Sequence, residues 1–268
     1  MQNGYYDAAG GMVTQFNRLN VVTNNLANLN TNGFKRDDVV IGDFKRLFEE
    51  KRDELPLNNH TKPSAKFLNR ALNNTPHVVE EYTNFDLGSM AKTSNPLDVA
   101  IKKNDSFFAV ETPAGIRYTR DGSFTIDGQG RVTTKEGFPV LSDNRAQITV
   151  PEGSEIMIDN DGGIHFKIQG QDINQEPDAK FLIAQFENIK TMKKEGQNLY
   201  SNADEPILST DSGTVMQGYI EKSNINAVLE MTALIETSRL VGMYQKVMDT
   251  QMNEVNGEAI NKIGNVRG

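Results

Sequence analysis

The sequence predicts an α+β protein in which two long terminal helices flank an antiparallel, β-rich middle region. Near both ends of the chain, apolar residues recur every seven positions, the spacing of a helix that packs along one face. Between the ends the apolar period falls to two, and short candidate strands alternate with turn sequences such as "RDG" and "DGQG". With 268 residues, the chain is long enough to bury a substantial core.

The N-terminal helix is predicted to run from about residue 5 to about residue 31. Its apolar residues form the two rows of a coiled-coil seam: Tyr5, Met12, Leu19 and Leu26 in one row, and Ala8, Val22 and Leu29 in the other. Gly33 suits the left-handed position just past a helix end. Lys35 and Arg36 would then lie near the negative end of the helix dipole.

The C-terminal helix has a heptad row of its own. Leu234, Val241, Met248 and Val255 are spaced by seven and form this row, and Met231 and Met252 lie on the companion row. A second apolar stripe, of Leu240, Tyr244 and Val247, lies on another face, which predicts contacts on more than one side, either with a core or with neighbouring subunits. Ser223 or Asn224 can cap the start of this helix, and a carboxylate follows in an early turn.

The predicted strands of the middle region lie at residues 107–111, 116–119, 123–126, 131–134, 138–141 and 180–186, with a further hairpin around "DNDGG". Together with the two helices, they divide the chain into four expected segments. The segments are an N-terminal helix at 1–35, an extended linker or loop at 36–86, a β-rich outer domain at 87–222 and a C-terminal helix at 223–268. The two helices either pair with each other as an assembly domain or pack on the middle of their own chain.

The composition argues against several classes of function. The net charge is −8, and the 28 basic residues are scattered, so nucleic acid is a poor candidate partner. Cysteine is absent, which rules out disulfides and thiolate chemistry. No run of about 18 apolar residues occurs, and the N-terminus lacks the features of a cleaved secretory signal. We therefore expect no membrane insertion.

The sequence also offers no recognisable catalytic, cofactor-binding or metal-binding set. His60, His77 and His165 are far apart and have no second ligand at a suitable spacing. The loop at Asp159 resembles the start of a calcium site, but Gly170 stands where the bidentate glutamate should be. We therefore expect no catalytic residue, no cofactor, no metal and no small-molecule substrate. A carboxylate pair of the glycosidase type is left open, because sequence alone cannot place two acidic residues together.

Motifs along the chain are similar to those of bacterial flagellar rod and hook proteins. "NNLANLNTNGFKR" (24–36) resembles the N-terminal signature of that family, and "GYIEKSNIN" (218–226) resembles its C-terminal motif. The middle follows the order of the family, with "PLDVAI" (96–101), "FFAV" (107–110), "YTRDGSF" (118–124) and "GFPVL" (137–141). Val241 and Gly242 depart from the aromatic residue and glutamate usual in the C-terminal motif, and "GFPVLSDN" favours the proximal-rod branch.

The resemblance implies a structural role. It predicts a non-enzymatic subunit of the proximal rod in the bacterial flagellar basal body, which polymerises through its terminal helices and transmits torque across the periplasm. The implied partners are copies of itself, other flagellar rod proteins and the flagellar type III export apparatus. The alternatives are a distal-rod or hook subunit of the same family and a periplasmic glycan hydrolase.

The resemblance also implies a role for the asparagine-rich stretch at residues 24–36. Side-chain amides whose hydrogen bonds are made are tolerated in buried contacts between subunits. The expected subunit-interface residues are Tyr5, Met12, Leu19, Asn24, Asn25, Leu26, Asn28, Leu29, Gly33, Phe34, Ser223, Asn224, Met231, Leu234, Ile235, Val241, Met248 and Val255.

Overall fold

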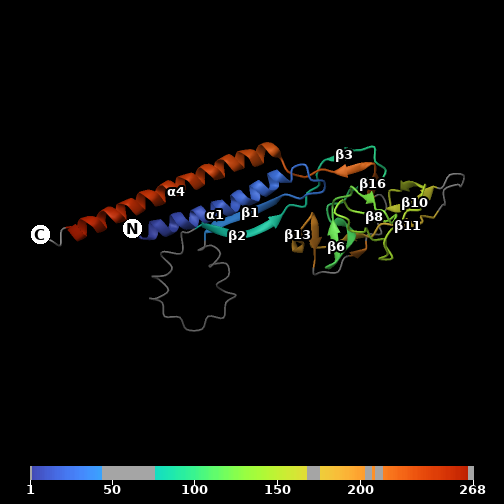
Figure 1. The fold of residues 1–268 in the computed structure, drawn as a ribbon, viewed down its shortest axis with the longest axis horizontal. Helices are drawn as coiled ribbons and strands as arrows, with labels where there is room; N and C mark the ends of the chain where they lie inside the picture. The colour runs from blue at the N-terminus through green and yellow to red at the C-terminus, as the bar shows by residue number, and fades with distance from the viewer. Residues whose placement is uncertain (1, 44–75, 168–175, 203–206, 209–213, 265–268) are drawn as a thin grey trace, which may run out of the picture. The chain divides into compact units, whose positions relative to one another are not determined.

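The computed structural model describes residues 2–43, 76–167, 176–202, 207–208 and 214–264 of the chain (Figure 1). The chain divides into two compact units. The first lies within residues 1–27, 37–82 and 226–268, and the second lies within residues 28–36 and 83–225. The first unit contains the two long helices and the second is built of antiparallel sheets, so the fold class is α+β, as predicted.

Two antiparallel helices dominate the first unit. They are α1 (Gln2–Ala27) and α4 (Ala227–Gly264). Their direction follows from their contacts, because Gly11 lies against Tyr244 whereas Asn25, further along α1, contacts Glu230, which is earlier in α4. The two helices pack along each other over much of the length of α1 (Figure 1).

A two-stranded sheet accompanies the helices. It is formed by β1 (Asp37–Asp43) and β2 (Pro76–Thr83), and β1 contacts α1. Both strands lie within the range 36–86, for which we predicted an extended linker or loop. Their backbone is extended, but the pairing of the two ends of this range was not foreseen. Residues 44–75, between the strands, lie outside the described residues.

The second unit is built around a six-stranded sheet in the order β13-β14-β6-β5-β12-β15. A three-stranded sheet, β11-β10-β9, and the pairs β16-β4, β17-β3 and β7-β8 complete it. Its elements are β3 (Met90–Lys92), β4 (Val99–Ile101), β5 (Ser106–Thr112), β6 (Gly115–Thr119), β7 (Thr125–Ile126), β8 (Val132–Thr133), β9 (Glu155–Ile158), β10 (Gly163–Lys167), β11 (Ala179–Lys180), β12 (Ile183–Gln185), the 3₁₀ turn η1 (Ile189–Thr191), β13 (Lys193–Gly196), β14 (Leu199–Ser201), β15 (Ile207–Leu208), β16 (Val215–Gln217) and β17 (Tyr219–Glu221).

Strand β5 supplies the centre of the core. Successive side chains of a strand point to opposite faces, and in β5 both faces are covered. Phe108 and Val110 pack into one apolar cluster, and Phe107 and Ala109 pack into another. All four side chains are fully buried. The second unit therefore has a conventional apolar core on both sides of its main sheet.

Several predicted strands are confirmed. The predictions at 107–111 and 116–119 correspond to β5 and β6, which pair antiparallel. The "DNDGG" turn joins β9 and β10 as a hairpin, also as predicted. The segment at 138–141 makes isolated bridges, for example between Val140 and Val110, rather than a regular strand.

The predicted C-terminal end of the first helix and the predicted cap of the second were wrong. α1 ends at Ala27, because residues 28–33 form turns that begin with a bond from the Thr31 N–H to the Asn28 carbonyl. α4 begins at Ala227, so neither Ser223 nor Asn224 is its cap. Asn226 takes that role, since its side-chain oxygen accepts hydrogen bonds from two backbone N–H groups of the first turn, at 3.0 and 3.3 Å.

Candidate functional site

The helix pair in the first unit encloses a polar seam. Its buried residues are Ala8, Gly11, Thr14, Gln15, Val22 and Asn25 on α1, and Glu230, Thr237 and Val241 on α4. The seam thus includes the row of Ala8 and Val22, whereas the row of Tyr5 and Met12 is not buried between the helices. Helices with polar and small residues between them gain little from the hydrophobic effect along the seam.

Small size is required at one point of the seam. A Cβ atom placed on Gly11 would lie 2.6 Å from the ring of Tyr244. That distance is well inside van der Waals contact, so a larger residue at position 11 would displace the ring. Gly11 therefore allows the two helices to approach closely.

Asn25 explains part of the asparagine-rich stretch. It is buried, donates a hydrogen bond from Nδ2 to the Asp37 carbonyl at 2.8 Å, and accepts one at Oδ1 from the Asp37 N–H at 3.0 Å. The same Nδ2 lies 3.4 Å from a carboxylate oxygen of Glu230 on α4. Asn28 Oδ1 accepts a bond from the Thr31 hydroxyl in the turns that follow α1. Asn25 therefore holds β1 and α4 beside α1, and Asn28 takes part in the turns that follow the helix.

Apolar side chains lie on the outside of the helix pair instead. Val228 and Ile235 are 72% and 69% exposed, and Val13 is 57% exposed. We call this set the outer faces of α1 and α4; it consists of Tyr5, Val13, Phe16, Val228, Leu229, Met231, Ile235, Met243, Val247 and Met252. Large apolar side chains exposed at many positions of two paired helices suggest an interaction surface.

The remaining predicted interface residues on the helices differ in how far they are buried. Met12, Leu19, Leu26, Leu29, Leu234 and Met248 are half-buried, Asn24 is exposed, and Val241 is buried in the seam. Val255 lies in α4, but its side chain is outside the described part of the structure.

Gly33, Phe34, Ser223 and Asn224 belong to the second unit. Gly33 has the predicted positive φ, at 67°, but it does not follow the last turn of the helix. A Cβ atom on Gly33 would lie 2.4 Å from the backbone of Arg120, so this position requires glycine for space as well as for conformation. Phe34 is buried beneath the Lys194 ammonium group, which lies 4.0 Å from the centre of its ring.

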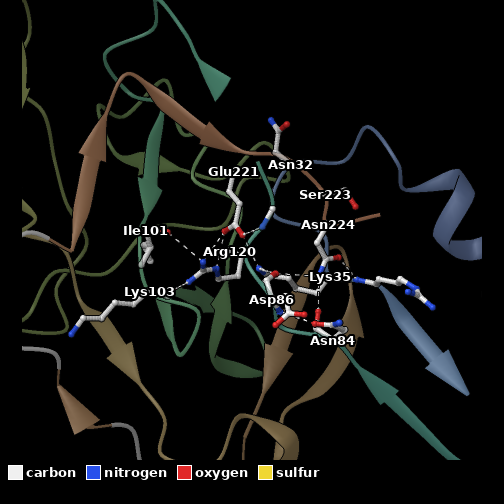
Figure 2. A network of polar contacts seen from close by, with 12 residues as sticks. Asn32, Lys35, Asn84, Asp86, Ile101, Lys103, Arg120, Glu221, Ser223 and Asn224 are labelled. Carbon is white, nitrogen blue, oxygen red and sulfur yellow. Dashed lines mark hydrogen bonds and ion pairs between the residues drawn. The ribbon is translucent and has the colours of Figure 1, made fainter. Parts of the chain in front are cut away.

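A cluster of three buried charges lies beside Gly33 (Figure 2). Lys35 Nζ lies 2.7 Å from Glu221 Oε1, and Arg120 Nη2 lies 2.8 Å from Glu221 Oε2. Each of the three side chains is at most 1% exposed. Burial lowers the pKa of Lys35 to about 8, and the positive charge of Arg120 acts in the same direction, against the attraction of Glu221.

Asn224 ties the same region together through its amide (Figure 2). Its Oδ1 accepts a hydrogen bond from the Arg36 N–H at 2.8 Å. Its Nδ2 donates to the carbonyls of Asn84 and Asp86, at 2.9 and 3.1 Å. A single side chain therefore links the segment that precedes α4 to two other segments of the second unit.

Arg120 and Glu221 were not predicted as site residues. Both lie in quoted motifs, "YTRDGSF" and "GYIEKSNIN", but charged residues usually face solvent. The available signal was that Lys35, Arg120 and Glu221 each belong to a different motif of the same family. Only the tertiary structure brings them together.

No arrangement typical of an enzyme was identified among the described residues. No three potential metal ligands of the His, Asp or Glu type gather there. His165 Nε2 lies 3.5 Å from Asp159 Oδ2 in the β9–β10 hairpin, His77 lies in β2, and His60 is outside the described residues. Within the same described ranges, neither α1 nor α4 is both long and apolar enough to cross a membrane.

Long paired helices with exposed apolar side chains are typical of a protein that assembles with others. Comparison with known families gives three matches along the chain. Residues 6–35 match the flagella basal body rod protein model, residues 101–166 match the flagellar hook protein FlgE/F/G D1 domain, and residues 216–259 match the flagellar basal body rod FlgEFG protein C-terminal model.

Curated relatives agree. The flagellar basal-body rod protein FlgG of Buchnera aphidicola subsp. Schizaphis graminum is 33% identical over 90% of this chain and 92% of its own length. The flagellar basal-body rod protein FlgF of Caulobacter vibrioides is 31% identical over 99% of this chain and 100% of its own. The flagellar hook-basal body complex protein FlhO of Bacillus subtilis is 25% identical over 95% and 99%. The chain belongs to the flagellar basal-body rod protein family, whose members are structural proteins and not enzymes.

Proposed function

We propose that this chain is a structural subunit of the flagellar rod that joins copies of itself and other rod proteins through the outer faces of α1 and α4. The observation that carries the proposal is the distribution of side chains on the helix pair: the seam contains small and polar residues with a few valines, while many large apolar side chains lie outside it. Complete burial of one large apolar side chain contributes about 1.5–3 kcal/mol. Repeated along two helices, such contacts would dominate the stability of an assembly.

The predicted interface residues divide into two roles under this proposal. Accessible side chains such as Tyr5, Met231 and Ile235 would touch neighbouring subunits directly. Buried residues such as Asn25 and Val241 would support those contacts by holding α1 and α4 together as a coiled-coil assembly domain. The half-buried residues of both helices would contribute at the edges of the outer faces.

Two positions along the rod are compatible with the relatives. The match to the FlgF protein over nearly the whole of both chains supports a place in the proximal rod. The FlgG relatives favour the distal rod as the second candidate. In either position we expect the chain to transmit torque across the periplasm, after export through the flagellar type III apparatus. Labelling the chain in isolated basal bodies would separate the two positions.

The assembly role can be tested with an outer-face variant. Ile235→Asp places a charge where the proposal requires an apolar contact, whereas Ser238→Asp adds the same charge to an exposed polar position one turn away. We expect Ile235→Asp to stop rod growth at this subunit while the purified chain stays folded by circular dichroism. Ser238→Asp should assemble normally. Rods of normal length and composition in the Ile235→Asp strain would contradict the proposal.

A further inference from the structure

The cluster of Lys35, Arg120 and Glu221 joins three parts of the chain that the family models match separately. Lys35 is the last residue of the N-terminal match, Arg120 lies in the middle match and Glu221 lies in the C-terminal match. All three residues belong to the second unit. Lys35 and Arg120 each lie within hydrogen-bonding distance of Glu221, although 186 positions separate Lys35 from Glu221 in the sequence.

The carboxylate of Glu221 pairs with both cations of this cluster, Lys35 and Arg120 (Figure 2). Glu221 Oε1 accepts hydrogen bonds from Lys35 Nζ and from the Gly88 N–H at 2.9 Å, and Oε2 accepts from Arg120. Arg120 also donates to the carbonyls of Ile101, Lys103 and Ser106. Loss of the Glu221 charge would therefore leave two buried cations without a counter-ion, whereas loss of Lys35 would leave the Arg120–Glu221 pair intact.

The backbones around the cluster are bonded to each other as well. The Gly33 N–H donates to the Glu221 carbonyl at 2.8 Å, and the Arg36 N–H donates to Asn224 Oδ1 at 2.8 Å. Residues 33–36 and residues 221–224 therefore lie side by side in the second unit. Neither of these two N–H groups is bonded to the carboxylate of Glu221, so they report on the docking of the segments and not on the ion pairs themselves.

We propose that Lys35, Arg120 and Glu221 form an interlock that makes the docking of residues 33–36 depend on the docking of residues 221–224. Without residues 221–224, the buried charge of Lys35 would lose the carboxylate that it contacts, whereas Glu221 would keep Arg120 if residues 33–36 were undocked. Residues 33–36 of the N-terminal signature are thus held in the second unit only when residues 221–224 of the C-terminal signature are in place. The inference concerns the fold of one chain and does not depend on assembly into a rod.

Hydrogen exchange on the purified full-length chain tests the interlock. In Glu221→Gln we expect the amides of Gly33 and Arg36 to exchange about 100-fold faster or more, because breaking a buried ion pair destabilises strongly. Amides of β9 and β10 should change by less than about threefold, since these strands lack contact with the cluster. Glu195→Gln, which breaks the partly exposed Arg117–Glu195 pair, should leave Gly33 and Arg36 unchanged.

A second pair of variants keeps the test decisive if Glu221→Gln fails to fold. Lys35→Met retains the Arg120–Glu221 pair and should accelerate exchange at Gly33 and Arg36 by about tenfold. The double variant Lys35→Met/Glu221→Gln should exchange more slowly than Glu221→Gln alone, or fold where it does not, because one uncompensated cation has been removed. Unchanged exchange at Gly33 and Arg36 in Lys35→Met, or additive effects in the double variant, would overturn the interlock.

Discussion

The two units differ in how much of their large apolar surface they bury. In the second unit, β5 is covered on both faces by apolar clusters, and the buried charges of Lys35, Arg120 and Glu221 are paired. In the first unit, the helix seam contains Gln15, Asn25, Glu230 and Thr237, while large apolar side chains remain exposed. The second unit therefore satisfies its apolar surface within one chain. The first leaves large apolar side chains exposed, and these are the side chains that we propose for contacts with neighbouring subunits.

The largest effect is expected from the core of the second unit. Phe108→Ala removes a fully buried ring that contacts Phe124 and Phe181, so the free energy of unfolding should fall by about 3–5 kcal/mol. Val13→Ala, on the outer face of α1, should change it by less than about 0.5 kcal/mol. Urea unfolding of both variants measures the difference. Equal losses would remove the contrast between the two units.

Gly33→Ala should come next in size. The substitution forces a side chain into a left-handed backbone and against the backbone of Arg120, which we expect to cost about 2–4 kcal/mol. Gly137→Ala is the matched control, because Gly137 also has a positive φ, of 91°, but a Cβ atom there would have no neighbour within 4 Å. The control should cost about 1 kcal/mol, from conformation alone. Similar melting temperatures for the two variants would show that the close approach at Gly33 is unimportant.

The stability of the second unit should also change with pH in the alkaline range. Lys35 has a pKa of about 8 in the folded chain against 10.5 ordinarily, so between these values the unfolded chain binds more protons. The free energy of unfolding should therefore rise from pH 8 to pH 10, by on the order of 1–2 kcal/mol, and Lys35→Met should lose this rise. Measurements should stop near pH 10, because burial raises the pKa of Tyr118 above 10.0, which acts in the opposite direction beyond that value. A pH profile identical to that of Lys35→Met would contradict the expectation.

The smallest effect is expected at the start of α4. Asn226→Ala removes the side chain that caps the helix and should cost about 1 kcal/mol. In the isolated chain we expect a local effect, with faster hydrogen exchange in the first turns of α4 and little change in β5. Asn253→Ala, at an exposed position within the same helix, is the control and should be nearly neutral. Loss of protection in β5 would mean that the two units unfold as one.

The sequence determined the α+β class, the long helices at both ends and the strands of the middle region. These features follow from local periodicity, which needs no knowledge of what the chain folds against. The same is true of the positive φ at Gly33 and the hairpin at "DNDGG", because turn chemistry acts over a few residues. The family motifs could be recognised for the same reason, as each is a continuous stretch.

Only the tertiary structure decided which face of each helix lies inside. A heptad row marks an apolar stripe but does not say whether that stripe meets the partner helix or a neighbouring subunit, and here polar residues such as Asn25 and Glu230 occupy the seam. The cluster of Lys35, Arg120 and Glu221 could not be predicted from the sequence either. A buried charge is stable only beside its counter-charge, and the residues that supply it come from distant parts of the chain, so their proximity is a property of the folded structure alone.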